Sequence, residues 1–169
     1  MLGLILFLLL AQPEETAISD GLVTCQTAVR FSPKGGIEDL LIKEIGLAKE
    51  RIRIAIYGLN NSKIVNALIA ASASGVNVAL KLDKAQSSGK NQKLQIARLH
   101  KAGIKVEISQ LSRLLHHKFM VVDAKKVWTG SYNWTTQAEN QHRENIVLLN
   151  CPEAADLFER EWVLIEIEN

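Results

Sequence analysis

The sequence has few of the residues that mark disulfide-rich, metal-binding or fibrous proteins. Its 169 residues include two cysteines, three prolines and 5% aromatic residues. Two cysteines exclude a densely disulfide-bonded scaffold, and without CxxC or HxxxH spacing they make a poor zinc site. No low-complexity tract or internal repeat stands out, and the contents of 47% apolar and 22% charged residues are globular values. The length suits one ordinary folded domain.

The sequence also lacks an apolar run long enough for a standard membrane helix. The run at residues 2–11 would span about 15 Å as a helix, half of the hydrocarbon core of a bilayer. That is the length of the apolar region of a signal peptide. No Lys or Arg precedes Arg30 and no clean cleavage site follows, so a retained membrane anchor is the alternative. We expect residues 1–20 to be a signal or anchor segment of an exported protein, and residues 21–169 to form the functional domain.

Export also bears on the two cysteines. In an oxidising compartment, Cys25 and Cys151 could form a disulfide, provided that the fold brings them together. Two buried free thiols are the alternative, and the sequence leaves both open.

Charge is nearly balanced overall, with a net charge of +2, but it is unevenly distributed. Residues 81–126 carry eleven Lys or Arg against three Asp or Glu, whereas residues 151–169 carry one Arg against six acids. A basic middle segment favours a polyanionic partner. Solvated lysines on loops and helix faces are the alternative, so charge alone does not decide the question.

Hydrophobic periodicity predicts the order of the elements. The alternating, strand-like segments are 22–31, 51–57, 76–83 and 104–109, and the segments of helical period between them are 37–48, 60–75 and 91–102. Strand, helix and glycine in this order are typical of βαβ units. Residues 117–131 instead predict a hairpin, and a strand at 145–150 precedes a C-terminal helix that begins at Pro152. We therefore expect an α/β domain with a mixed, largely parallel β-sheet flanked by helices.

Two adjacent histidines stand at the start of the predicted hairpin. Side chains alternate along a strand, so His116 and Lys118 share one face, with Cα atoms roughly 6.6 Å apart. His117 points to the other face with Phe119 and Val121. On one face, the lysine can neutralise a phosphate oxygen while a neutral imidazole attacks phosphorus. His116 is therefore the better candidate for a reactive group, and a polar strand end is the alternative.

These residues belong to a longer pattern. The sequence reads His116-x-Lys118-x4-Asp123-x6-Gly130-Ser131-x-Asn133, with Glu144 eleven residues further on. The pattern closely resembles the HKD signature of the phospholipase D superfamily, with its trailing G-S-x-N and acidic residue. The order of elements over residues 22–165 is similar to that of the short bacterial endonucleases of this superfamily, which have one HKD motif per chain. The resemblance implies a phospholipase D-like fold and a phosphodiesterase.

The resemblance also implies roles for four catalytic residues. His116 is the nucleophile in one copy of the site, where it forms a phosphohistidine, and the general acid and base in the other copy. Lys118 and Asn133 bind the phosphoryl oxygens. Glu144 orients a histidine through its second ring nitrogen.

Four other polar residues have weaker claims. The resemblance gives Asp123 and Ser131 supporting roles, although Asp123 is equally well interpreted as a plain turn residue. His100 and His142 match no position of the motif. We expect His100 to be solvated on its helix and His142 to lie at most at the edge of a substrate groove.

The single HxK unit predicts a dimer. Phosphodiester cleavage needs both a nucleophile and an acid for the leaving alkoxide, and one histidine cannot be both in one step. A two-fold homodimer whose axis passes between two copies of His116 supplies both. The two histidines then share roughly one proton near neutral pH, which predicts a bell-shaped rate profile. The sequence has no carboxylate cluster suited to Mg²⁺, so we expect neither a metal nor another cofactor.

The substrate is the least determined feature. Lys84, Lys90 and Lys93 could follow a DNA or RNA backbone, and Trp134 could stack on a base; for Trp128 we expect packing within its strand instead. The alternative substrate is a phospholipid such as cardiolipin, favoured by the apolar N-terminus and by the leucines before His116. Hydrolysis and transfer to an alcohol are both open. A catalytically inactive binding module would not need the complete motif.

Overall fold

The computed structural model describes residues 22–110 and 113–167, so the expected signal or anchor segment at residues 1–20 lies outside the described residues. Within the described ranges, no helix is both long and apolar enough to cross a membrane. The strands are β1 (Gln26–Phe31), β2 (Arg51–Ile56), β3 (Asn77–Leu82), β4 (Lys105–Ile108), β5 (Lys118–Val122), β6 (Lys126–Gly130) and β7 (Asn145–Asn150). The helices are α1 (Ile37–Leu47), α2 (Ser62–Ala73), α3 (Lys84–Ser87), α4 (Lys90–Lys101), α5 (Thr136–Asn140) and α6 (Pro152–Leu164).

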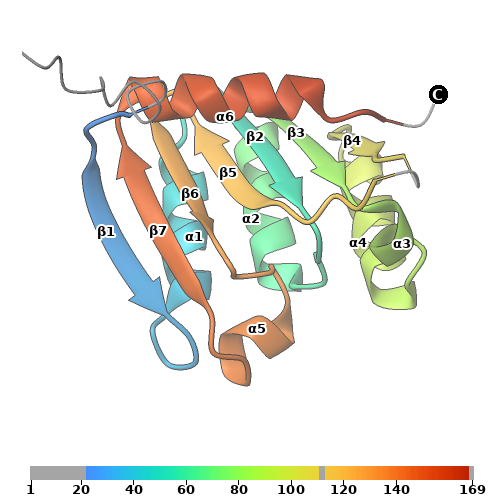
Figure 1. Ribbon diagram of the computed structural model, residues 1–169. Coiled ribbons are helices and arrows are strands. Elements are labelled where there is room, and N and C mark those ends of the chain that lie inside the picture. The colour runs from blue at the N-terminus through green and yellow to red at the C-terminus, as the bar shows by residue number, and fades with distance from the viewer. Residues whose placement is uncertain (1–21, 111–112, 168–169) are drawn as a thin grey trace, which may run out of the picture.

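The strands form one seven-stranded sheet in the order β1-β7-β6-β5-β2-β3-β4 (Figure 1). The pairs β2–β3 and β3–β4 are parallel, whereas the four other neighbouring pairs are antiparallel. The mixed α/β sheet is thus confirmed, but its parallel part is smaller than expected. The reason is that the predicted hairpin enters the middle of the sheet: β5 pairs antiparallel with β2, and the antiparallel pairing continues through β6, β7 and β1.

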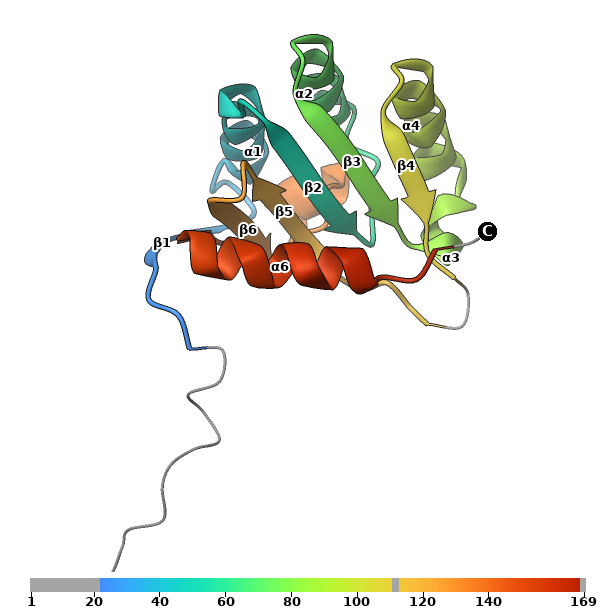
Figure 2. The same cartoon turned by 90° about the horizontal axis from the view of Figure 1, so that it is seen from above.

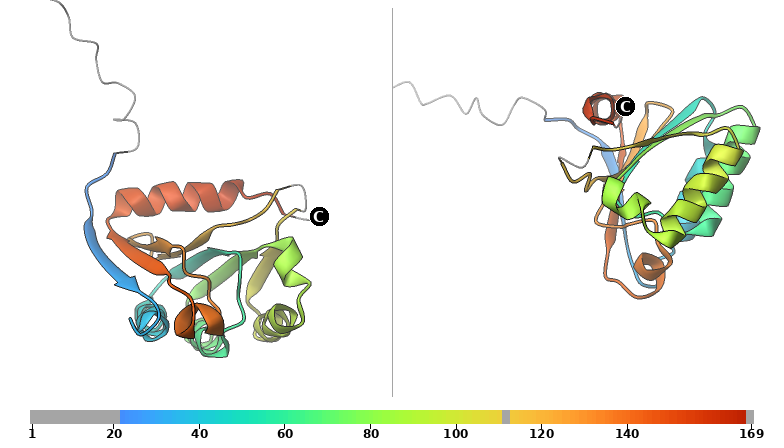
Figure 3. Two further views of the ribbon diagram at one scale, coloured as in Figure 1. Left: turned by 60° about the horizontal axis from the view of Figure 1, so that its bottom comes forward. Right: turned by 90° about the vertical axis from the view of Figure 1, so that its right-hand side faces the viewer.

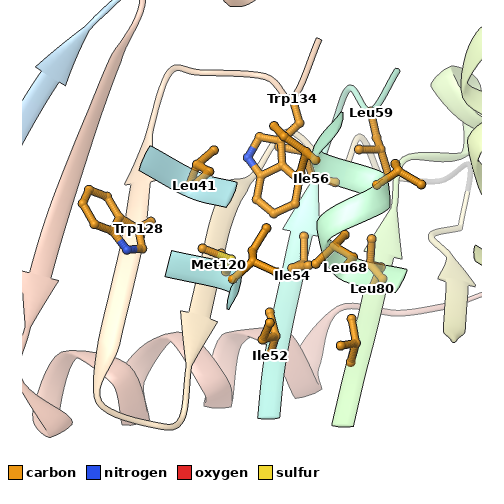
Figure 4. Packing of buried hydrophobic residues seen from close by; sticks show 14 of the residues in the cluster. Leu41, Ile52, Ile54, Ile56, Leu59, Leu68, Leu80, Met120, Trp128 and Trp134 are labelled. Atoms are coloured by element: carbon orange, nitrogen blue, oxygen red, sulfur yellow. The ribbon is translucent and has the colours of Figure 1, made fainter. Parts of the chain in front are cut away.

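Helices cover both faces of this sheet. Helices α1, α2 and α4 lie on one face, and α6 crosses the other (Figures 2 and 3). Successive side chains of a strand therefore enter two different apolar clusters. Ile54 and Met120 belong to the cluster on the three-helix side (Figure 4), and Ala55 and Phe119 to the cluster beneath α6. This double burial explains why β5 carries apolar residues on both faces; on β2, the face towards α6 carries Arg51 and Arg53 beside Ala55.

Two short helices lie outside the predicted elements, and each is capped by the side chain before it. The carboxylate of Asp83 accepts a hydrogen bond from the N–H of Gln86 at 2.9 Å, which begins α3 inside the segment expected to be a loop. The hydroxyl of Thr135 accepts one from the N–H of Ala138 at 3.1 Å, which begins α5. Local capping, rather than hydrophobic periodicity, produces these turns.

The two cysteines form a disulfide. The Cα atoms of Cys25 and Cys151 are 5.1 Å apart although the residues are separated by 126 positions. Cys25 precedes the edge strand β1, and Cys151 is the residue before α6. The bond connects the edge of the sheet to the helix that covers its second face. The structure therefore favours the disulfide over the alternative of two free thiols.

Candidate active site

The residues of the predicted motif, except Asp123, meet at one edge of the sheet. Strand β2 ends at Ile56, which pairs with Lys118 at the start of β5. Strand β6 runs back to the same edge and ends at Gly130, which pairs with Ile146 near the start of β7. The ends of these four strands therefore bring together segments that are far apart in the sequence, such as Gly58 and Asn133, which are 75 positions apart. Figure 1 shows this edge, where the loops after β2 and β6 approach the start of β5.

His116 and Lys118 lie together at this edge, as predicted. The ammonium of Lys118 donates a hydrogen bond to the carbonyl oxygen of His116 at 2.7 Å. The ring of Tyr57 lies 4.7 Å from the His116 ring, between centroids, and its centroid is 5.1 Å from the Lys118 nitrogen. Burial lowers the pKa of Lys118 and the charge of Glu144 opposes that shift. An exposed imidazole thus lies beside a partly desolvated cation.

His117 lies on the opposite face, as the alternation predicted. Its Nε2 atom is 3.0 Å from the carboxylate oxygen of Glu161 in α6, and its ring lies 5.5 Å from that of Phe119. Phe119 belongs to the apolar cluster beneath α6. The two neighbouring histidines therefore have different surroundings, and His117 is turned towards α6.

Asn133 is oriented by the backbone of the loop after β2. Its side-chain oxygen accepts a hydrogen bond from the N–H of Gly58 at 3.0 Å. A Cβ atom at residue 58 would lie 3.2 Å from that oxygen, so glycine allows this close approach. Because the oxygen is engaged, the amide N–H₂ group of Asn133 is the part that can donate to a phosphate oxygen.

Glu144 is held by Ser131. The Ser131 hydroxyl donates to the Glu144 carboxylate at 2.6 Å and accepts from the N–H of Asn145 at 3.0 Å. The other carboxylate oxygen of Glu144 lies 3.6 Å from Nδ1 of His142. Within the described residues, no hydrogen bond joins Glu144 to His116 of the same chain. The predicted orientation of a histidine by Glu144 remains a prediction, and Ser131 supports Glu144 directly.

Asp123 is not brought into the site, because it lies at the far end of β5 from His116. It stands in the β5–β6 turn, with a φ of 52°. Its carboxylate accepts hydrogen bonds from the N–H groups of Lys49, Glu50 and Arg51 at 2.9, 2.8 and 3.0 Å. Burial alone would raise the pKa of Asp123, but these donors together outweigh it and leave the pKa below its usual value. The contacts favour the interpretation as a turn residue.

We expect Asp123→Ala to lower the free energy of unfolding at neutral pH by about 1–2 kcal/mol, because three backbone N–H groups, two of them on exposed residues, lose a charged acceptor. Since the pKa of Asp123 is depressed in the folded state, this stabilisation is present above the unfolded pKa of about 3.9. It is lost as the pH falls through the lower, folded value. Urea denaturation at several pH values measures both effects.

The matched control for this variant is Asp156→Ala, which removes an exposed carboxylate paired with Arg160 on one helix face. It should change stability by less than about 0.5 kcal/mol. Turnover per folded molecule should be unchanged in Asp123→Ala. Lost turnover at unchanged stability would instead assign Asp123 to the catalytic machinery.

The residues predicted to bind substrate differ in their exposure to solvent. Trp134 is only 2% exposed and packs in the core near Ile56 (Figure 4), so the expectation that it stacks on a base is wrong. Its position follows from three backbone hydrogen bonds with the loop after β2, which hold it against the core. Lys90 and Lys93 are exposed at the start of α4, and Lys84 begins α3 and is half-buried.

Two residues near His116 and Lys118 were not identified as site residues by the sequence analysis. Tyr57 directly follows β2, and its hydroxyl accepts a hydrogen bond from the side-chain N–H of Gln86 at 2.8 Å. The available signal for Tyr57 was its place at the carboxyl end of an alternating strand, where binding sites of parallel sheets gather. No sequence pattern indicated Gln86, because its position depends on the unexpected helix α3.

The side chains of this edge do not suit a metal ion. Among the described residues, no three His, Cys, Asp or Glu side chains are grouped so as to hold one. The charged groups at the site are instead Lys118 and Glu144, with the neutral amide of Asn133. This donor set can bind a phosphodiester and stabilise negative charge on its oxygens.

Known proteins resemble this chain in sequence and in structure. A family model described as "Cardiolipin synthase, PLD-like domain" matches residues 41–163. The phospholipase D of Rickettsia bellii is 34% identical over 139 residues, which are 82% of this chain and 68% of that protein. The mitochondrial cardiolipin hydrolase of Mus musculus is 32% identical over 122 residues, 72% of this chain and 54% of that protein.

Solved structures show the same arrangement. Nuc from Salmonella typhimurium, described as a phospholipase D family member, matches with a TM-score of 0.78 at 30% identity, over 83% of this chain and 93% of that one. NucT from Helicobacter pylori matches with a TM-score of 0.75 at 21% identity, over 84% of this chain and 96% of that one. The second likeness concerns the fold alone.

Proposed function

The chain belongs to the phospholipase D superfamily and is a phosphodiesterase, and from this premise we propose that it is a non-specific, metal-independent endonuclease. In this proposal it acts through a phosphohistidine in a composite site formed by a homodimer. The observation that carries the chemistry is that the imidazole of His116 and the ammonium of Lys118 both contact the ring of Tyr57 at the sheet edge. There Asn133 has its amide oxygen engaged by Gly58, and its N–H₂ group can donate.

The reaction has two steps. The neutral imidazole of His116 attacks phosphorus, a P–N bond forms and the P–O bond to the leaving alkoxide breaks. The protonated His116 of the partner subunit gives its proton to that alkoxide. The partner's His116, now neutral, then takes a proton from water, which attacks phosphorus and breaks the P–N bond. Lys118 and Asn133 stabilise the charge that develops on the phosphoryl oxygens in both steps.

The surroundings of the site favour nucleic acid over lipid. Lys90 and Lys93 are exposed on the helix that follows α3, and α3 contacts Tyr57 through Gln86. A pocket of about 200 Å³ lies beside the loops that hold Asn133, and it is lined by uncharged polar side chains together with Leu94. The pocket-lining residues are Asn60, Ser62, Asn91, Leu94, Gln95, Thr136 and Gln137. Amides and hydroxyls suit sugars and base edges better than acyl chains.

The test is incubation of the full-length protein with supercoiled plasmid DNA and with single-stranded RNA in excess EDTA. Nicking of DNA, or shortening of RNA, without a divalent metal supports the proposal. The parallel arm uses vesicles that contain cardiolipin, with phosphatidic acid as the measured product. Activity on vesicles alone would contradict the endonuclease proposal and support a phospholipase.

The phospholipid alternative has an observation of its own. Leu114 is 63% exposed and Leu164 is 72% exposed. Both line a pocket of about 170 Å³ that also contains Arg113 and His117. An apolar rim with an arginine is the kind of surface that contacts anionic lipid, although Glu161 and Glu166 also line this pocket and oppose such a contact. The names of the Rickettsia and Mus relatives also concern phospholipids.

The composite site makes a quantitative prediction for mixed dimers. Wild-type and His116→Ala chains with different affinity tags are co-expressed, and the heterodimer is purified through both tags. Because one histidine cannot be nucleophile and acid in the same step, we expect this heterodimer to retain no more than about 1% of wild-type turnover. Independent sites would retain half of the activity, and that result would contradict the dimer proposal.

We also propose that the protein is exported. The Cys25–Cys151 disulfide supports this, because such bonds persist in oxidising compartments. Thiol alkylation followed by mass spectrometry, on protein from separated cell fractions, tests the localisation and the state of the cysteines together. Reduced protein confined to the cytosolic fraction would contradict export.

A further inference from the structure

Tyr57 is in contact with both reactive side chains of the site. Its ring centroid is 4.7 Å from that of His116, with the ring planes inclined by 59°. The Lys118 ammonium lies 5.1 Å from the same ring centroid. These distances are in the range of favourable aromatic and cation–π contacts. A single aromatic side chain thus adjoins the imidazole and the cation that act on one phosphate.

Tyr57 is itself fixed at both ends. Its backbone N–H donates to the carbonyl oxygen of His117 at 2.9 Å, which continues the β2–β5 pairing. Its hydroxyl accepts the hydrogen bond from Gln86 at 2.8 Å. Asp83 fixes the helical turn that carries Gln86. Its carboxylate accepts hydrogen bonds from the N–H groups of Gln86 at 2.9 Å and Leu115 at 3.2 Å.

Packing of the core does not account for this arrangement. The neighbouring residues Ile56 and Leu59 are fully buried, whereas Tyr57 is half-buried and belongs to neither apolar cluster. Its hydroxyl is directed to α3, and its ring faces the exposed His116. The contacts of this ring are with catalytic side chains rather than with core residues.

We propose that Tyr57 is a positioning residue that restricts His116 and Lys118 to the geometry required for attack on phosphorus. The inference rests on the proposed phosphohistidine chemistry and adds a residue that lies outside the HKD motif. A histidine at the end of a strand and a four-carbon lysine side chain each have several rotamers in water. The ring blocks part of that space, and Gln86 holds the ring in place. Such restriction acts mainly on turnover, because a small displacement of a nucleophile slows the chemical step.

The test compares two replacements of one residue on a small substrate. Tyr57→Phe keeps the ring and removes the hydroxyl, whereas Tyr57→Leu keeps apolar bulk and removes the ring. The substrate is bis(4-nitrophenyl) phosphate, which has no nucleic acid or lipid part, with kcat and KM measured separately. We expect Tyr57→Leu to lower kcat about 10–100-fold with KM within about threefold. Tyr57→Phe should retain kcat within about threefold, because it keeps the ring and loses only the hydrogen bond from Gln86.

Other outcomes overturn the inference. Unchanged kcat in Tyr57→Leu would show that the ring does not position the pair, and equal losses in both variants would assign the effect to the hydroxyl. A change confined to KM would make Tyr57 a substrate contact. Should Tyr57→Leu fail to fold, Tyr57→Met has a similar volume and the same expected loss. If wild type hydrolyses the small diester but cuts no nucleic acid, the endonuclease proposal fails while this test remains decisive.

Discussion

His116→Ala should lower turnover of a phosphodiester by at least about 10⁴-fold, because the variant loses the nucleophile in one copy of the site and the acid in the other. His116 is the exposed histidine whose ring contacts Tyr57 and whose carbonyl oxygen accepts a hydrogen bond from Lys118. Substrate binding should change far less, since Lys118 and Asn133 are retained. Single-turnover cleavage of a labelled oligonucleotide, with binding measured separately, distinguishes the two quantities.

His117→Ala is the matched control, since it removes the same side chain one position away. His117 is on the opposite face and contacts Glu161, so its loss should leave turnover within about threefold of wild type. The covalent intermediate gives a second readout. Acid-labile phosphate should be trapped on wild type and on His117→Ala, and not on His116→Ala. Loss of activity in His117→Ala alone would show that the strand alternation does not select the reactive histidine.

Replacement of Lys118 by glutamine is expected to lower kcat about 10²–10³-fold, the usual effect of removing one charged group that stabilises a transition state. Lys118 is partly desolvated and lies in the field of Glu144. Its charge therefore acts on phosphate more strongly than that of a lysine in water. The matched control is Lys101→Gln, an exposed lysine at the end of α4, which changes net charge equally and should alter kcat by less than about twofold.

Lys118 should also determine how kcat depends on pH on the alkaline side of the profile. Burial lowers the pKa of Lys118 below the ordinary lysine value, with Glu144 opposing this. Only the protonated form stabilises phosphoryl oxygens, so wild-type kcat should fall as the pH rises through this lowered pKa. The variant Lys118→Gln should lack that decline. A decline of the same midpoint in both proteins would assign it to another group.

The sequence alone determined the parts of the molecule that depend on short-range order. Alternation with a period of two, and apolar repeats with a period of 3.6, predicted the main strands and helices. The motif residues were predictable because they lie at or beside the ends of β5, β6 and β7, which pair as neighbours. The face of His116 followed from its spacing to Lys118, since side chains alternate in any strand.

The tertiary structure decided whatever depends on contacts between distant segments. Tyr57 meets His116 only because β2 pairs with β5, and Asp123 serves residues 49–51 because the β5–β6 turn lies beside the start of β2. Trp134 is drawn into the core by the loop after β2, so an aromatic residue next to the motif is unavailable to a substrate.

The register of the strands and the burial of their side chains depend on the whole sheet and its two helical layers. Local sequence patterns therefore do not predict them. The same holds for the Cys25–Cys151 disulfide, which requires β1 and α6 to meet. Sequence spacing therefore predicted the roles of His116 and Lys118, and only the packing of distant strands determined which other side chains surround them.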